Sequence, residues 1–174
     1  MDIPCDAATA TKEKRMIAIS LLRKPARKLL MIRGQNATDY FSFCEEVGCH
    51  TWNRLLAMPH ALDEPLGLWM PDVLRPAGTS FYIQGVEVAV DNHGELPQGM
   101  DYVVLPAQDY LLFSSGPFAP QDMNQVIDQV RQAIERHDPH LSSQAWADTD
   151  APRLQYAPDP QKGYREARPV KPRV

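Results

Sequence analysis

A short motif occurs twice in this chain, about eighty residues apart. Residues 29–34 read Leu-Leu-Met-Ile-Arg-Gly and residues 111–116 read Leu-Leu-Phe-Ser-Ser-Gly, so each copy holds two leucines, three variable positions and a glycine. Each copy is followed by a helical pattern, at 38–58 and 121–137, and then by strand-like segments. A period this long is not that of a solenoid, so it indicates two fused half-domains. The alternative is a plain α+β domain without an internal repeat.

Both copies predict the same order of elements, which is a strand, a helix and two further strands. We expect an α+β fold in which two such units, about 25–92 and 100–172, are related by a pseudo-twofold axis and share an antiparallel sheet. Each half is too small to bury a good core alone, so the two are expected to face each other. The groove between them is the natural place for a ligand. Residues 1–24 are expected to form an N-terminal tail and lead-in, and 25–174 the domain.

Composition limits the classes of function. The chain has 174 residues, of which 44% are hydrophobic, and this suits one domain of ordinary size. Its formal net charge of -4 argues against a general nucleic-acid-binding surface, because phosphate binding needs an excess of basic residues. No run approaches the roughly 18 apolar residues of a membrane span, and the start lacks the apolar core of a signal peptide. We therefore expect a cytoplasmic protein with no nucleic-acid or membrane partner.

Metal and cofactor chemistry have little support in the sequence. The three cysteines are an odd count without the paired spacing of a zinc site, and the five histidines have no metal-ligand spacing. The glycines form no phosphate-binding loop, and the serines lie in no nucleophile elbow. No metal and no cofactor are expected.

Two carboxylates carry the strongest chemical signal. Period-two alternation places Glu87 on the apolar side of its strand, and Glu166 takes the matching place in the second copy, on the face that holds Tyr164. Burying an ionised carboxylate without a partner is costly or raises its pKa, so chains seldom keep one without a compensating contact. If the units oppose, both acids point into the groove. The alternative is that one or both pair with a nearby arginine or face water.

In the groove, either acid would contact a ligand or, with Tyr164 to orient it, act as a general acid or base. Glu87 has the more apolar neighbours, whereas Arg165 and Arg168 flank Glu166. We therefore expect Glu87→Gln to lose more ligand binding than Glu166→Gln. Because a buried charge is removed, stability is expected to stay level or to improve.

Aromatic side chains accompany these acids along the sequence. Trp69, Tyr82 and Tyr164 lie on strands beside glycines, where a missing side chain lets another group approach. Aromatic walls around a carboxylate favour flat apolar or cationic molecules, since ring faces attract cations. Trp52 lies on a helical stripe, for which a core position is the alternative. The candidate ligand-binding residues are Trp52, Trp69, Phe81, Tyr82, Phe113, Trp146 and Tyr156.

Several short segments together resemble the GyrI-like small-molecule-binding domain, also called the AraC-type effector-binding domain, over about residues 25–172. The segments that carry the resemblance most strongly are Gly85-Val86-Glu87-Val88, Gly163-Tyr164-Arg165-Glu166 and Pro169-Val170. The resemblance implies a pseudo-twofold pair of units around a ligand groove, with a glutamate in an aromatic-lined cleft that binds hydrophobic, often cationic or planar compounds. One departure is Gln155, which stands where relatives often have an acidic residue.

The resemblance leaves three functions open. The first is a stand-alone protein that binds a hydrophobic drug or toxin and protects against xenobiotics. Regulators of this type carry a DNA-binding domain ahead of the module, and only about 25 residues precede the first expected strand here. The second is a hydrolase of reactive cyclopropane-bearing genotoxins that uses Glu87 or Glu166. The third is a modulator that binds a protein partner such as gyrase, and the oligomeric state stays open.

Overall fold

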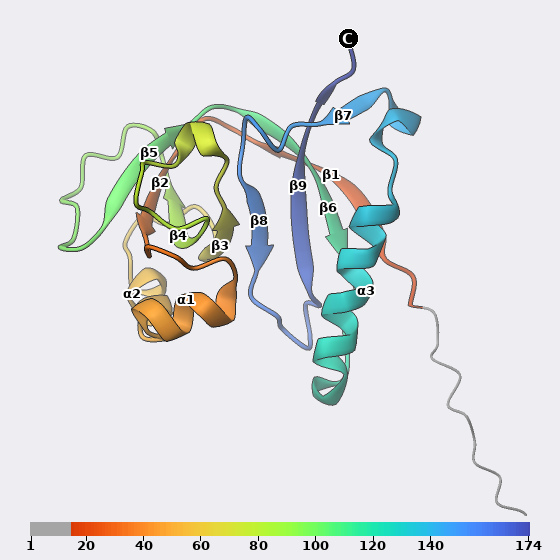
Figure 1. Cartoon of the computed structure of the whole chain (residues 1–174), viewed down its shortest axis with the longest axis horizontal. Helices are drawn as coiled ribbons and strands as arrows, with labels where there is room; N and C mark the ends of the chain where they lie inside the picture. Colours follow the sequence, from red (N-terminus) through yellow and green to blue (C-terminus); the bar gives the residue numbers. More distant parts are fainter. Residues whose placement is uncertain (1–14) are drawn as a thin grey trace, which may run out of the picture.

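A computed structural model describes residues 15–174 of the chain (Figure 1). The helices are α1 (Tyr40–Val47), α2 (Thr51–Leu56) and α3 (Met123–Arg136). The strands are β1 (Ala18–Lys24), β2 (Arg27–Ile32), β3 (Leu66–Trp69), β4 (Tyr82–Val88), β5 (Asp101–Leu105), β6 (Gln108–Ser114), β7 (Gln144–Trp146), β8 (Arg153–Tyr156) and β9 (Arg165–Pro172). Short 3-10 turns occupy Asp72–Leu74, Pro120–Asp122 and Pro139–Ser142.

The strands of residues 15–174 form one antiparallel sheet whose order is nearly palindromic. The order is β1-β6-β9-β8-β3-β4-β2-β5, and β7 adds to β9. β3 and β8 meet at the centre, and each remaining strand on one side has a counterpart on the other. One unit therefore contains β1 to β4 with α1 and α2, and the other contains β5 to β9 with α3. This confirms the expected α+β fold of two strand-helix-strand-strand units.

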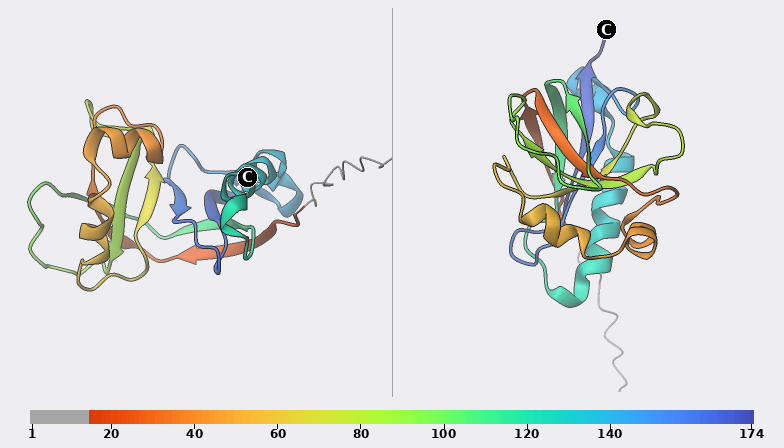
Figure 2. Two further views of the ribbon diagram at one scale, coloured as in Figure 1. Left: turned by 90° about the horizontal axis from the view of Figure 1, so that it is seen from below. Right: turned by 90° about the vertical axis from the view of Figure 1, so that its left-hand side faces the viewer.

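Each unit begins with a strand that precedes its Leu-Leu motif, and the first of them, β1, lies outside the predicted bounds of the repeat. β1 leads through Pro25 into β2, yet it pairs with β6 of the other unit. In the same way, β5 leads through Pro106 into β6 and pairs with β2. The two units thus exchange their first strands, and β1 runs along the sheet from one half to the other (Figure 2).

The helix expected at 38–58 is two shorter helices. Gly48, with φ at 107°, closes α1 through a hydrogen bond from its amide to the carbonyl of Cys44, and α2 follows at Thr51. A left-handed φ of this size favours glycine. Asp39 rather than Thr38 caps α1, because its side chain accepts a hydrogen bond from the amide of Ser42. None of the helices within residues 15–174 has the length and apolar character that crossing a membrane requires.

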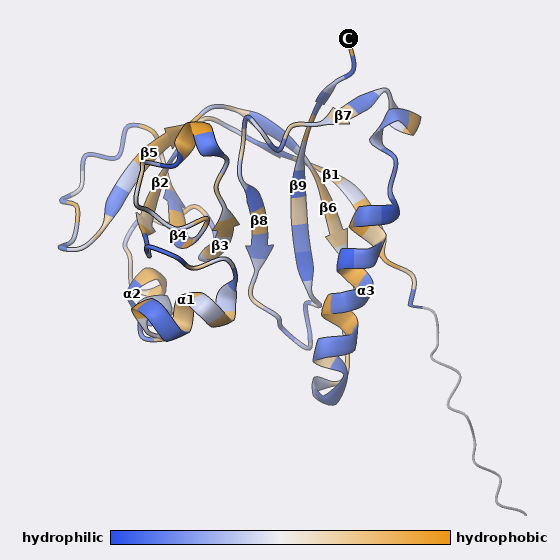
Figure 3. Ribbon diagram, viewed as in Figure 1, coloured by the Kyte–Doolittle hydropathy of each residue, from blue (hydrophilic) through white to orange (hydrophobic). Residues whose placement is uncertain are grey.

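The core lies on both faces of the sheet. In Figure 3, α3 alternates between hydrophobic and hydrophilic residues along its length. Leu30 packs beneath α1 and α2, and Leu111 packs beneath α3, so these two leucines are structural counterparts. Leu29 points to the opposite face, into a cluster that residues of both units build. The two Leu-Leu motifs are therefore one residue out of register in the fold, because the counterpart of Leu29 in that cluster is Tyr110.

One exposed carboxylate near the end of α1 holds the loop between β2 and α1. The Glu46 carboxylate accepts hydrogen bonds from three successive backbone amides, those of Gln35, Asn36 and Ala37, the last two at 2.7 and 3.0 Å. These amides hold the pKa of Glu46 below its ordinary value of 4.5. Gly34 makes room for the contact, since a Cβ there would lie 2.8 Å from a Glu46 oxygen.

Glu46→Gln is expected to lower the melting temperature at pH 7 by about 2 °C, because an amide accepts these hydrogen bonds less strongly than a carboxylate. A lowered pKa contributes stability above the unfolded value and loses it as pH falls through the folded value. The difference between wild type and variant should therefore shrink from pH 7 to pH 3. Thermal unfolding at both pH values measures it, with the exposed neighbour Glu45→Gln as control. A constant difference across that range would contradict the assignment.

Candidate functional site

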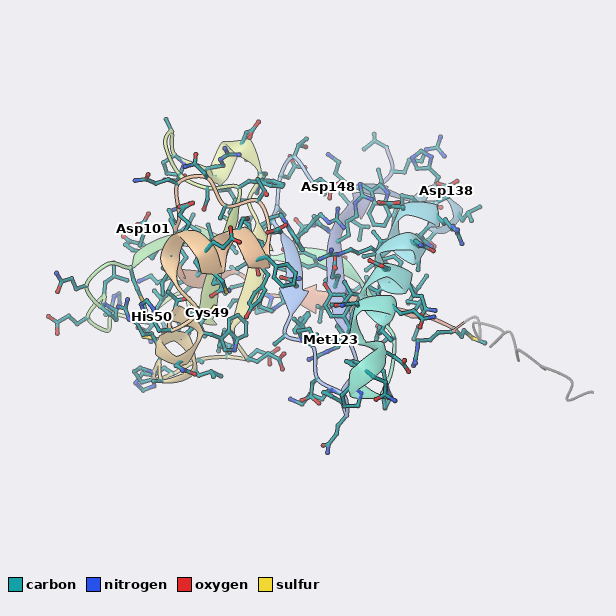
Figure 4. The ribbon with its side chains drawn as sticks, turned by 60° about the horizontal axis from the view of Figure 1, so that its bottom comes forward. Cys49, His50, Asp101, Met123, Asp138 and Asp148 are labelled. Atoms are coloured by element: carbon teal, nitrogen blue, oxygen red, sulfur yellow. The ribbon has the colours of Figure 1, made fainter. Side chains whose placement is uncertain are left out.

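A cavity of about 800 Å³ separates α1 and α2 from α3 on the helical face of the sheet. Cys49, just after α1, and Met123, at the start of α3, lie on opposite walls (Figure 4). Residues of β3, β4 and β8 form the floor. The lining residues are Asp39, Tyr40, Phe41, Cys49, Trp52, Asn53, Gly67, Tyr82, Met123, Asn124, Ile127, Asp128, Arg131, Gln155, Tyr156, Ala157 and Pro158. This is the groove between the two units that the repeat predicted.

A single row of cross-strand partners defines the floor. Directly paired residues in antiparallel strands share one face of the sheet. In order across the sheet, the row is Ile32, Gln84, Gly67, Gln155, Glu166 and Phe113. Its centre falls between Gly67 and Gln155. By position, Gln84 is therefore the counterpart of Glu166, and Gly67 is the counterpart of Gln155.

Four side chains of this face form one continuous hydrogen-bonded chain. The Tyr82 hydroxyl donates to Gln155 Oε1 at 2.7 Å, and Gln155 Nε2 donates to the Tyr164 hydroxyl at 3.1 Å. Tyr164 in turn donates to Oε2 of Glu166. Gly67 lies beneath this chain, and a Cβ there would overlap the Tyr82 hydroxyl. Burial raises the pKa of both tyrosines, so both remain neutral donors.

Arg131 neutralises Glu166 beneath the cavity. Glu166 is 1% exposed, and its Oε2 accepts a hydrogen bond of 2.9 Å from Nε of Arg131 on α3. Arg153 lies 3.7 Å from the other carboxylate oxygen. Both guanidinium groups also lie about 6 Å from the ring of Trp69, at 6.0 and 5.8 Å. The buried acid is thus held in an ion pair at the floor and presents no free charge to the cavity.

The walls combine aromatic rings with two acids. Asp39 on the α1 side and Asp128 on α3 both line the cavity. Hydrogen bonds from the backbone and side chain of Ser42 hold the pKa of Asp39 below its ordinary value. A hydrogen bond with Cys44, together with burial, raises the pKa of Tyr40 to about 12, so its hydroxyl is neutral at physiological pH. Phe41 is 72% exposed in the same lining, and its ring packs edge-on against that of Tyr40 with centroids 5.5 Å apart.

The structure brings together six of the predicted site residues. Trp52 and Tyr82 line the cavity, and Tyr164 and Glu166 lie directly beneath its floor. Trp69 packs edge-on against Tyr82 with ring centroids 5.4 Å apart. Tyr156 borders the cavity, although its ring packs into the core of the other face. Whether these residues contact a ligand stays a prediction.

Three predicted aromatics lie elsewhere. Phe113 is buried beneath α3, where it closes the core rather than lining the cavity. Trp146 packs beside the same core and lies under Arg168, whose guanidinium is 4.2 Å from its ring centroid. Phe81 is half exposed near Arg75, outside the cavity lining.

The expectation that both acids point into the groove is wrong for Glu87. Glu87 pairs across the sheet with Leu29 and so points to the face opposite the helices. There Lys24 and Arg27 both bind its carboxylate, the latter through Nε at 2.5 Å. Arg27 also donates to the Tyr110 hydroxyl at 3.2 Å and to the carbonyl of Pro106 at 3.0 Å. The ion-paired alternative describes this residue, because β1 and β2 bring two cations to it.

Sequence reasoning missed the wall that α3 contributes. Asn124, Asp128 and Arg131 recur at spacings of four and three, which places them on one side of the helix. This polar stripe runs beside the buried stripe of Val126, Val130 and Ile134. A polar helix face that lines a cavity has the same sequence pattern as one that faces solvent. The stripe alone therefore could not reveal the site.

No protein-family model and no curated protein match the sequence, but solved structures do. A structure entitled SAV2435 bound to tetraphenylphosphonium has a TM-score of 0.56 at 18% identity, over 88% of this chain and 94% of that one. A Staphylococcus aureus MU50 protein gives 0.53 at 17% identity, over 88% and 98%. The EcmrR C-terminal domain gives 0.50 at 14% identity, over 91% and 99%. The chain therefore has the fold of the GyrI-like effector-binding domains, as the resemblance in its sequence implied.

Proposed function

We propose that this protein binds hydrophobic aromatic small molecules, planar or cationic, in the cavity between α1, α2 and α3. The observation that carries the proposal is a cavity of about 800 Å³ with aromatic walls and a few convergent polar groups. Pockets of about 300–1,000 Å³ with this composition are typical ligand sites. The similar SAV2435 structure holds tetraphenylphosphonium, a bulky aromatic cation, and this supports hydrophobic aromatic cations as a ligand class here.

The acids on the walls favour ligands with positive charge. Asp39 lines the cavity from the α1 side and Asp128 lines it from α3, and the Trp52 ring belongs to the same lining. Carboxylates beside aromatic faces attract a cation that can stack on the rings. The proposed ligand class is therefore an aromatic compound that carries a positive charge.

Binding has better support than hydrolysis. A general acid or base must reach the substrate within hydrogen-bonding distance. Glu166 is 1% exposed and is held by Tyr164, Arg131 and Arg153, while Tyr164 is fully buried. Gln155 and Arg131 stand between this pair and the cavity. Mass spectrometry of a bound ligand after prolonged incubation distinguishes the two functions, since a binding protein returns it unchanged.

Filling the cavity is expected to weaken binding. Ile127 lies on the α3 wall, and Ile127→Trp adds a bulky ring at that position. Titration calorimetry with tetraphenylphosphonium should show at least a tenfold loss of affinity. Gln132→Trp, on the exposed side of α3, is the matched control and should bind like wild type. Equal affinity in Ile127→Trp would contradict the assignment of this cavity, and no binding by wild type would contradict the ligand class.

A further inference from the structure

The charge of Glu166 fixes how the Gln155 amide is oriented. A carboxylate held by Arg131 only accepts hydrogen bonds, so Tyr164 must donate to it. The Tyr164 oxygen then accepts from its other neighbour, which must be the NH2 group of Gln155. The Gln155 carbonyl consequently faces Tyr82 and accepts from its hydroxyl. The Gln155 side-chain amide cannot flip by 180° without losing the hydrogen bonds with Tyr82 and Tyr164.

This orientation leaves a hydrogen-bond donor at the cavity floor. The NH2 group of Gln155 carries two hydrogens, and Tyr164 accepts one of them. Within residues 15–174 no protein group accepts the second. Because Gln155 belongs to the lining, this hydrogen is available to a ligand.

Arg131 adds further donors at the same place. Its guanidinium contacts Glu166 through Nε and also the Tyr164 hydroxyl, and these two contacts leave N–H groups of the terminal nitrogens without a protein acceptor within the described part of the chain. The side chain is 43% exposed and lines the cavity. A guanidinium has five N–H groups in a planar fork, so Arg131 can hold Glu166 from behind and an oxygen of the ligand in front.

The floor and the walls therefore differ in what they recognise. The walls carry the acids Asp39 and Asp128, while the floor presents N–H groups of Arg131 and Gln155 above a neutralised glutamate. A ligand without an acceptor at that end displaces the water that these donors bind and leaves the donors without a hydrogen bond, which weakens its binding. A ligand with an acceptor oxygen at that end satisfies the donors.

We propose that the preferred ligand is dipolar, with a flat cationic aromatic body between the walls and a carboxylate at Arg131 and Gln155. This rests on the proposed function of the cavity and specifies its ligand class. Charge-assisted hydrogen bonds from an arginine to a carboxylate are among the stronger contacts that proteins make. Arg131 is on this basis a specificity-determining residue.

Two dyes that differ in one group test the proposal. Rhodamine 110 carries a free carboxylate on a flat cationic ring system, and rhodamine 123 is its methyl ester. Fluorescence anisotropy with the full chain should show rhodamine 110 bound at least about tenfold more tightly. Arg131→Gln should reduce the ratio of the two affinities to about one, whereas Arg136→Gln, at the exposed end of α3, should leave the ratio unchanged.

The outcomes separate this proposal from the one on which it rests. Equal affinity for the two dyes, or tighter binding of the ester, would contradict recognition of a carboxylate by Arg131 and Gln155. The assignment of the cavity as the binding site would still stand. Failure of both dyes and of tetraphenylphosphonium to bind would overturn both proposals. The comparison in wild type needs no variant, and thermal unfolding of Arg131→Gln shows whether its altered ratio comes from a folded protein.

Discussion

Glu87→Ala is expected to lower the free energy of unfolding by about 3–5 kcal/mol, the typical effect of removing one partner from a buried ion pair. The side chains of Arg27 and Lys24 are 2% and 9% exposed, and Glu87 is their shared counterion. Without it, two cations remain in a poorly solvated part of the core. Glu87→Gln keeps the shape but removes the charge, so it should cost less than alanine and still destabilise.

Chemical denaturation of Glu87→Ala and Glu87→Gln measures this effect, with Glu135→Ala on the exposed side of α3 as the control. Ligand affinity of both variants should match that of wild type while they remain folded, because Glu87 lies on the face opposite the cavity. This reverses the expectation from sequence that Glu87→Gln removes binding and keeps stability. A stable variant that lost its ligand would restore that expectation and contradict the geometry.

Gly67→Ala is expected to affect stability and ligand binding together. The added methyl group would overlap the Tyr82 hydroxyl and come within 2.8 Å of Gln155 Oε1. Tyr82 is held between Phe43 and Trp69 at ring distances of 5.8 and 5.4 Å and has little room to move. Overpacking of this kind typically costs about 1–3 kcal/mol. It also displaces the Gln155 amide from the cavity floor.

Tyr82→Phe serves as the reference for this variant, since it removes the hydrogen bond to Gln155 without adding an atom. Thermal unfolding should give Gly67→Ala a lower melting temperature than Tyr82→Phe. Titration with tetraphenylphosphonium should show at least a tenfold loss for Gly67→Ala. Wild-type affinity in Gly67→Ala would mean that the ligand does not use the central floor of the cavity.

The repeat could be predicted from sequence because each unit contains its own periodic helix and strands. The Leu-Leu motif located both units, yet it aligned Leu29 with Leu111, which lie on opposite faces of the sheet. An error of one residue reverses the face of every side chain in a strand. Glu87 was likewise matched with Glu166, whereas the register makes Gln84, three residues before Glu87 and on the other face of the sheet, the counterpart of Glu166.

Part of the site was accessible from sequence through single residues. Glu166 was singled out because it matched Glu87 in the repeat, and Tyr164 because it lies on a strand beside a glycine; both lie beneath the cavity floor. Arg131 did not stand out, because an arginine on an amphipathic helix is ordinary until the opposite wall is known. The pairing of Glu87 also depended on β1, whose cross-unit partner no local pattern specifies.

The exchange of first strands has a consequence for how this protein evolves and folds. β1 completes the sheet of the second unit, and β5 completes the sheet of the first, so each unit leaves an open strand edge when the other is absent. Contacts of this kind join residues far apart in sequence, and such pairing is slow because chain entropy is lost before the contacts form. Although the cavity is built from two like halves, the halves are not separable modules. Each can diverge in its own wall of the cavity, but neither can be lost.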